Sequence, residues 1–65
     1  MKYYIIPSAM AEQLSLTEYR HGDQERGYLV HSGDLVNYGL ENAERDGATE
    51  VSLADARNFV KHLNK

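Results

Sequence analysis

The 65-residue sequence contains no cysteine and no tryptophan, and it has only one proline. Without cysteine, disulfide bonds and thiolate metal ligands are both excluded, although chains this short often depend on one of them for stability. Packing, self-association or a metal site built from His and carboxylates are the remaining means of stabilisation. The lack of cysteine is also typical of a reducing compartment, and we expect a cytoplasmic protein.

Long hydrophobic runs are also missing. The N-terminal segment 1–7 carries one lysine and then a short apolar run that ends at Pro7. This run is shorter than the apolar region of a signal peptide and far shorter than a membrane span. We therefore expect neither a targeting signal nor an association with a membrane.

Positive charge is scarce, because 7 Lys and Arg residues face 10 Asp and Glu residues and the net charge is −3. Such a chain repels nucleic acid unless a local cationic patch overrides the total. A hydrophobic content of 42% with 26% charged residues is typical of a folded globular protein. The length leaves room for a single domain, which we place at residues 1–65.

Hydrophobic periodicity, turn residues and capping residues predict seven secondary-structure elements. They are a strand at 2–6, a short helix capped by Ser8 and reaching Leu14, a strand at 16–20, a strand at 27–31, a helix at 32–46, a strand at 49–51 and a helix at about 52–64. The polar segment His21–Arg26 is expected to form the tip of a hairpin. The prediction is an α+β fold in the order β-α-β-β-α-β-α, with a small sheet of three to four short strands packed by two to three helices.

The C-terminal helix has the clearest pattern. Ser52 and Asp55 resemble a capping box, and five apolar residues fall within an arc of about 120° on a helical projection; they are Leu53, Ala56, Phe59, Val60 and Leu63. We expect this stripe to close the core, so that Phe59→Ala would cost about 3 to 5 kcal/mol.

Two further features concern packing. Gly39 lies inside the predicted helix 32–46 and costs about 1 kcal/mol relative to Ala, so we expect either close packing or a break there. Tyr3 and Tyr4 point to opposite sides of the first strand. Both faces of the sheet are therefore expected to be partly covered.

A metal site is the first chemical hypothesis, because His21, His31 and His62 occur with carboxylates such as Asp23 and Asp34. The three histidines belong to different predicted elements and lack the close spacing of a typical zinc site. We therefore interpret them as surface histidines and expect no metal or other cofactor.

Catalytic motifs are also lacking. The sequence has no phosphate-binding glycine loop, no nucleophile elbow and no HExxH pattern. His21 and Asp23 fall in the predicted hairpin tip, where solvation opposes the shifted pKa values that acid–base catalysis needs. An enzyme would require a pocket joining His31, Asp34 and a tyrosine such as Tyr28, and we expect none.

Interaction is the remaining interpretation, and the aromatic composition favours it. Five tyrosines accompany a single phenylalanine, and tyrosine is common where one end of a side chain is buried and the other is wet. A helical projection of segment 32–46 places Tyr38 opposite its buried side and near Arg45. We predict Tyr38 and Arg45 as partner-binding residues, although a single exposed tyrosine often has no such role.

Two functions are therefore considered. The leading hypothesis is a small binding module that acts through an unknown protein partner or as a homo-oligomer. The alternative is a nucleic-acid-binding accessory or regulatory protein that uses Arg57, Lys61 and Lys65, which are spaced four residues apart on the last helix. The same cations also complement the helix dipole and the acidic segment 41–50, so nucleic acid is the less favoured partner.

Overall fold

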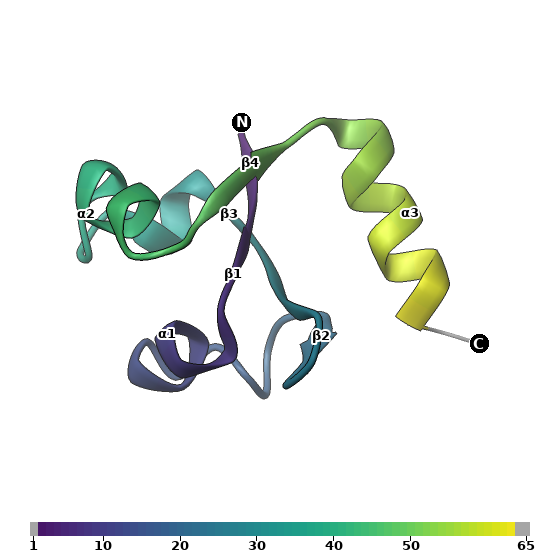
Figure 1. The fold of residues 1–65 in the computed structure, drawn as a ribbon, viewed down its shortest axis with the longest axis horizontal. Coiled ribbons are helices and arrows are strands. Elements are labelled where there is room, and N and C mark those ends of the chain that lie inside the picture. The colour runs from purple at the N-terminus through teal and green to yellow at the C-terminus, as the bar shows by residue number, and fades with distance from the viewer. Residues whose placement is uncertain (1, 64–65) are drawn as a thin grey trace.

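The computed structural model describes residues 2–63. Its elements are β1 (Tyr3–Ile6), α1 (Ser8–Gln13), β2 (Gly22–Asp23), β3 (Gly27–His31), the 3-10 helix η1 (Ser32–Leu35), α2 (Leu40–Arg45), β4 (Thr49–Val51) and α3 (Leu53–Leu63). One sheet lies between α1, η1 and α2 on one side and α3 on the other (Figure 1). The predicted α+β class and element order are confirmed. The predicted helix end at Asn64 and the predicted cation Lys65 lie outside the described residues.

The four strands are antiparallel to their neighbours and lie in the order β2-β3-β1-β4. Tyr4 pairs with Val30 and Ile6 with Tyr28, and all four side chains are buried on one face, here called the inner face. The intervening residues form the outer face, and they are Tyr3, Ile5, Leu29 and His31. These outer-face residues are half-buried. Both faces are thus partly covered, as the alternation of Tyr3 and Tyr4 predicts.

The main core lies between the inner face and the helices on that side. Its largest fully buried side chains are Tyr4, Ile6, Val30 and Leu35. Smaller contributions come from Met10 and Ala11 of α1, Ala43 of α2 and Ala48. Burial of each large apolar side chain stabilises the fold by roughly 1.5 to 3 kcal/mol. None of the residues in this main core belongs to α3.

Helix α3 covers the outer face instead of closing the main core. Ser52 caps it, because the Ser52 hydroxyl accepts a 3.1 Å hydrogen bond from the Asp55 backbone amide, as predicted. Of its apolar stripe only Ala56 is buried, Phe59 and Val60 are half-buried, and Leu53 is 50% exposed. The prediction that this stripe closes the core was wrong, because the edge strand β4 leads the chain to the opposite side of the sheet (Figure 1).

The strand predicted at 16–20 is also wrong. Ser15 adopts a φ of 58°, and the amides of Tyr19 and Arg20 both donate hydrogen bonds to the Leu16 carbonyl, which makes a turn rather than an extended segment. The strand next to β3 is formed instead by Gly22–Asp23, within the segment predicted to be the hairpin tip. The backbone hydrogen bonds of this turn thus determine the conformation of segment 16–20, rather than the weak alternation of its apolar and polar side chains.

The helix predicted at 32–46 is interrupted at Gly39, whose φ is +93°. This break confirms one of the two expectations for Gly39, and it separates η1 from α2. The change of direction also alters part of the predicted apolar side, which was expected to include Val36 and Leu40, although Leu35 and Ala43 are buried. Val36 is 68% exposed and Leu40 is 37% exposed, whereas Tyr38 is half-buried and packs against the core. A helical projection assumes one continuous helix, so it could not predict which of these side chains are exposed.

The short helix α1 begins at Ser8, but no side-chain hydrogen bond caps it. Pro7 occupies the N-cap position in an extended conformation, so the predicted capping role of Ser8 is wrong. Among the described helices, none combines the length and the apolar character needed to cross a membrane.

Candidate interaction site

The most strongly bonded polar cluster joins the turn before β2 to η1. The Arg20 guanidinium donates two hydrogen bonds to the Asp34 carboxylate, from Nε to Oδ2 at 2.7 Å and from Nη2 to Oδ1 at 2.8 Å. Asp34 also accepts a 3.2 Å hydrogen bond from the His31 backbone amide. Its side chain is only 10% exposed. This bidentate pair of hydrogen bonds therefore fixes the Arg20 and Asp34 side chains relative to each other.

The electrostatics of this cluster favour a structural role. The hydrogen bonds from Arg20 hold the pKa of Asp34 below its usual range despite partial burial, and Asp34 in turn raises the pKa of Arg20. Both groups therefore stay charged at neutral pH. A carboxylate fixed in this way is a poor proton acceptor, because catalysis at neutral pH needs a pKa near the working pH.

The structure does not bring His31, Asp34 and Tyr28 together. His31 lies beside Asp34, with Nε2 at 3.5 Å from Oδ1, but Tyr28 is buried on the inner face of the sheet. His31 belongs to the outer face, because residues of opposite parity in β3 point to opposite sides. The pocket joining His31, Asp34 and Tyr28 is thus absent from the described residues.

The metal hypothesis has no support in the geometry. Across residues 2–63, no three His, Asp or Glu side chains are grouped closely enough to hold a metal ion. Asp23 instead accepts a 2.6 Å hydrogen bond from the Arg26 amide and closes the β2–β3 turn. His21 and His62 are both exposed.

The two predicted partner-binding residues, Tyr38 and Arg45, meet at Asp46. The Tyr38 hydroxyl donates a hydrogen bond to Asp46 Oδ2, and Arg45 Nε lies 3.5 Å from Asp46 Oδ1. This hydrogen bond raises the pKa of Tyr38 and lowers the pKa of Asp46. Because Tyr38 precedes α2 and Asp46 follows it, the contact ties the two ends of the helix together. The partner-binding role of Tyr38 and Arg45 stays a prediction.

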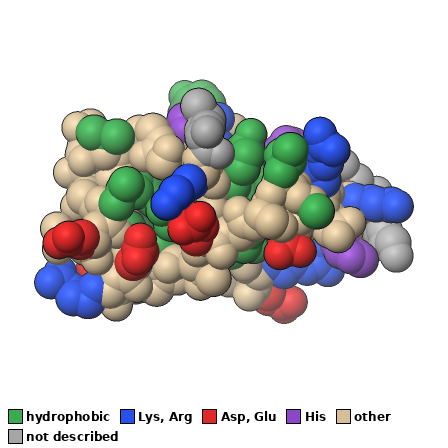
Figure 2. Space-filling view, turned by 90° about the horizontal axis from the view of Figure 1, so that it is seen from above, with side chains coloured by type: hydrophobic (Ala, Val, Ile, Leu, Met, Phe, Trp, Pro, Cys, Tyr) green, Lys and Arg blue, Asp and Glu red, His purple; other side chains and the backbone are tan. Residues whose placement is uncertain are grey.

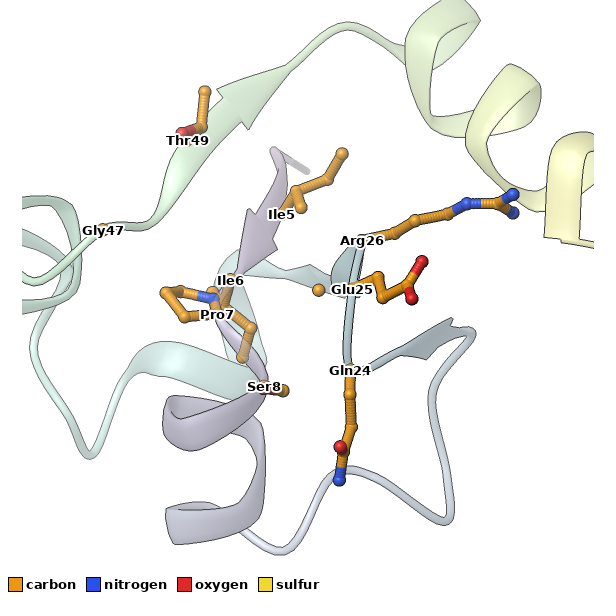
Figure 3. Close-up of a pocket in the computed structure, with 10 residues that line it drawn as sticks. Ile5, Ile6, Pro7, Ser8, Gln24, Glu25, Arg26, Gly47 and Thr49 are labelled. Atoms are coloured by element: carbon orange, nitrogen blue, oxygen red, sulfur yellow. The ribbon is translucent and has the colours of Figure 1, made fainter.

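A hollow of about 310 Å³ lies between the end of β1, the β2–β3 turn and the start of β4. Figure 3 shows Gln24, Glu25 and Arg26 on the turn, with the Arg26 side chain extended towards α3. Arg26 Nη1 donates a 3.2 Å hydrogen bond to the His62 carbonyl. The carboxylate of Glu25 is the only acidic group in the lining. The hollow thus lacks the paired acid and base of a hydrolytic site.

An apolar depression lies between α3 and the outer face of the sheet. It measures about 300 Å³ and is called the α3 groove; its lining residues are Tyr3, Leu29, Leu53, Ala56, Arg57 and Val60. Leu53 is 50% exposed at its rim, while Ala56 is buried at the helix–sheet contact. The groove therefore leaves part of its apolar lining exposed.

Cations border this groove. Arg57 lines it, and Lys61 follows one helical turn later on the same side of α3. Both side chains are exposed, and within residues 2–63 neither has a carboxylate at ion-pair distance. Figure 2 shows Lys, Arg and His side chains gathered at the α3 end of the molecule. Two of the three cations predicted for nucleic-acid contact are thus available to a ligand.

The sequence did not reveal this groove. The sequence shows the apolar stripe of α3, but Tyr3 and Leu29 come from two strands and lie beside α3 only in the folded chain. The pairing of Arg20 with Asp34 was missed for the same reason, since fourteen residues separate them. No local signal in the sequence indicates either contact.

The fold and these surfaces define a small α+β protein with an open, cation-bordered apolar groove. Comparison with models of protein families, with curated proteins and with solved structures finds no match to this chain. Function must therefore be argued from the surfaces.

Proposed function

We propose that this chain is a small binding module that acts through protein–protein contact, with the α3 groove as its docking surface. The observation that carries the proposal is the exposure of Leu53, which is 50% exposed while Ala56, three residues further along the same helix, is buried. An apolar rim beside a helix–sheet contact is the kind of surface that a partner side chain fills.

The site chemistry supports binding over catalysis. The best-formed polar cluster, Arg20 with Asp34, is an ion pair whose hydrogen-bonding groups already serve each other. The α3 groove contains one charged residue, Arg57, among apolar neighbours. Such a lining resembles an interface in which apolar contact gives affinity and one charge gives orientation.

A site-specific cross-linking experiment tests this function. A photo-reactive residue is placed at Leu53 in the native host, and a matched control carries it at the exposed Glu12 of α1. We expect a discrete protein adduct from position 53 and none from position 12. The adduct can contain another protein or a second copy of this chain, and either result supports the function. Equal, diffuse labelling from both positions would contradict it.

A second function is favoured by the exposed cations of α3. Arg57 and Lys61 lie one turn apart at the end of the molecule where Lys, Arg and His side chains gather (Figure 2). Phosphate contacts by such residues give affinity that falls as salt rises. The net charge of −3 opposes this function, which is why we rank it second.

Fluorescence anisotropy with short DNA and RNA at low salt distinguishes the two functions. Nucleic-acid binding predicts an anisotropy increase that salt reverses and that the double variant Arg57→Glu, Lys61→Glu abolishes. An unchanged signal at low salt would exclude this second function. The cytoplasmic location stays a prediction that fractionation of the host would check.

A further inference from the structure

A second apolar surface lies at the opposite end of the molecule from the α3 groove. It is called the α2 surface and consists of Val36, Leu40, Glu41 and Glu44. Val36 is 68% exposed and Leu40 is 37% exposed, and Glu41 follows Leu40 on α2. Glu44 is exposed and lies one turn after Leu40 on α2. This surface exists because Gly39 breaks the helix and turns both apolar side chains outwards.

The two surfaces carry opposite charges beside their apolar residues. Carboxylates of Glu41 and Glu44 border the α2 surface, and the cations of Arg57 and Lys61 border the α3 groove. The only cation on α2, Arg45, lies 3.5 Å from Asp46. Apolar contact combined with opposite charge is the complementarity that fixes partner and orientation at interfaces.

These surfaces cannot meet within one molecule. The molecule extends 31 Å along its longest axis, and α2 and α3 lie at opposite ends of that axis (Figure 1). Contact between an α2 surface and an α3 groove therefore requires a second copy of the chain. Copies placed head to tail meet through different surfaces, and such a heterologous contact can continue into a ring or an open chain.

We infer that the chain associates head to tail, with Val36 and Leu40 of one copy occupying the α3 groove of the next. This inference rests on the proposed function, because it names the occupant of the same groove. Glu41 and Glu44 then face Arg57 and Lys61 of the neighbouring copy. The area of each surface is small, so the association is weak and depends on concentration and salt.

Sedimentation of the purified full chain over a concentration series at low salt tests the inference. The wild-type weight-average mass is expected to rise above that of a monomer as the concentration approaches about 1 mM, and to fall again when salt is added. A monomer throughout the series would overturn the inference. Cross-linking from Leu53 to a different protein in the host would leave the proposed function standing in that case.

Charge reversal on each surface tests the head-to-tail geometry. Glu41→Lys and Arg57→Glu are each expected to raise the dissociation constant about tenfold or more, since each places like charges opposite one another. An equimolar mixture of the two variants is expected to regain association, because each variant then offers a surface that the other can bind. Loss in only one of the two variants would show that the α2 surface does not contact the α3 groove and would overturn the inference.

Glu12→Lys is the matched control, because it changes the net charge as much as Glu41→Lys does at an exposed position of α1. We expect this control to associate like the wild type. A loss equal to that of Glu41→Lys would show that net charge alone governs association, which would also overturn the inference. Thermal unfolding by circular dichroism establishes that each variant is folded before it is compared.

Discussion

Arg20 and Asp34 hold the turn before β2 against η1 through two parallel hydrogen bonds across fourteen residues of sequence. Asp34 is also the acidic residue in the first turn of η1. The contact between Arg20 and Asp34 joins two segments that lack regular hydrogen-bonded ladders of their own. A small fold with a thin core depends on such contacts more than a larger one does, because its total stability is only a few kcal/mol.

Removing either partner of this pair is expected to destabilise the fold. Arg20→Ala should lower the free energy of unfolding by about 1 to 2 kcal/mol, and Asp34→Ala by about 2 to 3 kcal/mol, because Asp34 also accepts from the His31 amide. Urea unfolding measures both. Arg26→Ala is the control, since its 3.8 Å pair with Asp23 and its hydrogen bond to the His62 carbonyl are both exposed, and their loss should cost less than about 1 kcal/mol. Equal costs at Arg20 and Arg26 would contradict the structural role.

The same pair predicts the acid sensitivity of the protein. Hydrogen bonds from Arg20 lower the pKa of Asp34 in the folded state, so its stabilising contribution is complete above the ordinary carboxyl pKa of about 4. This contribution is lost as the pH falls through the lowered folded-state pKa. Asp34→Asn should flatten this part of the stability profile, measured by urea unfolding between pH 2 and pH 6. An unchanged slope in that variant would show that other carboxylates govern acid unfolding.

The location of the core predicts a contrast between Leu35 and Phe59. Leu35 is fully buried beneath the inner face, so Leu35→Ala should cost about 3 to 4 kcal/mol. Phe59 is only half-buried on α3, and Phe59→Ala should cost about 1 to 2 kcal/mol, less than the sequence alone suggests. Thermal or urea unfolding checks both. A larger loss for Phe59 would show that α3 contributes more to the fold than its burial indicates.

Glycine at position 27 is expected to be indispensable. Its φ is +86°, and a Cβ atom there would collide with the Ile6 carbonyl oxygen of the neighbouring strand. Gly27→Ala should therefore destabilise the β1–β3 pairing by about 2 kcal/mol or more. Gly33→Ala is the control, because position 33 has no positive φ and its Cβ would meet only the His31 ring at 3.0 Å. Similar stability of the two variants would contradict this explanation.

Local sequence determined those features that depend on a few neighbouring residues. Alternation predicted β1 and β3, Ser52 marked the start of α3, and Gly39 indicated either close packing or a break before α2. Each of these follows from side-chain periodicity or from backbone conformations that only certain residues adopt readily. The α+β class and the element order could therefore be predicted.

Only the tertiary structure decided which surfaces meet. Helix α3 lies on the outer face because the chain leaves the edge strand β4 on that side, and its own stripe would suit either face of a sheet. The break at Gly39 exposes Val36 and Leu40, and the folded path brings Arg20 to Asp34. The α3 groove could not be predicted from the sequence for the same physical reason. Its lining residues come from β1, β3 and α3, which meet only when the whole chain has folded.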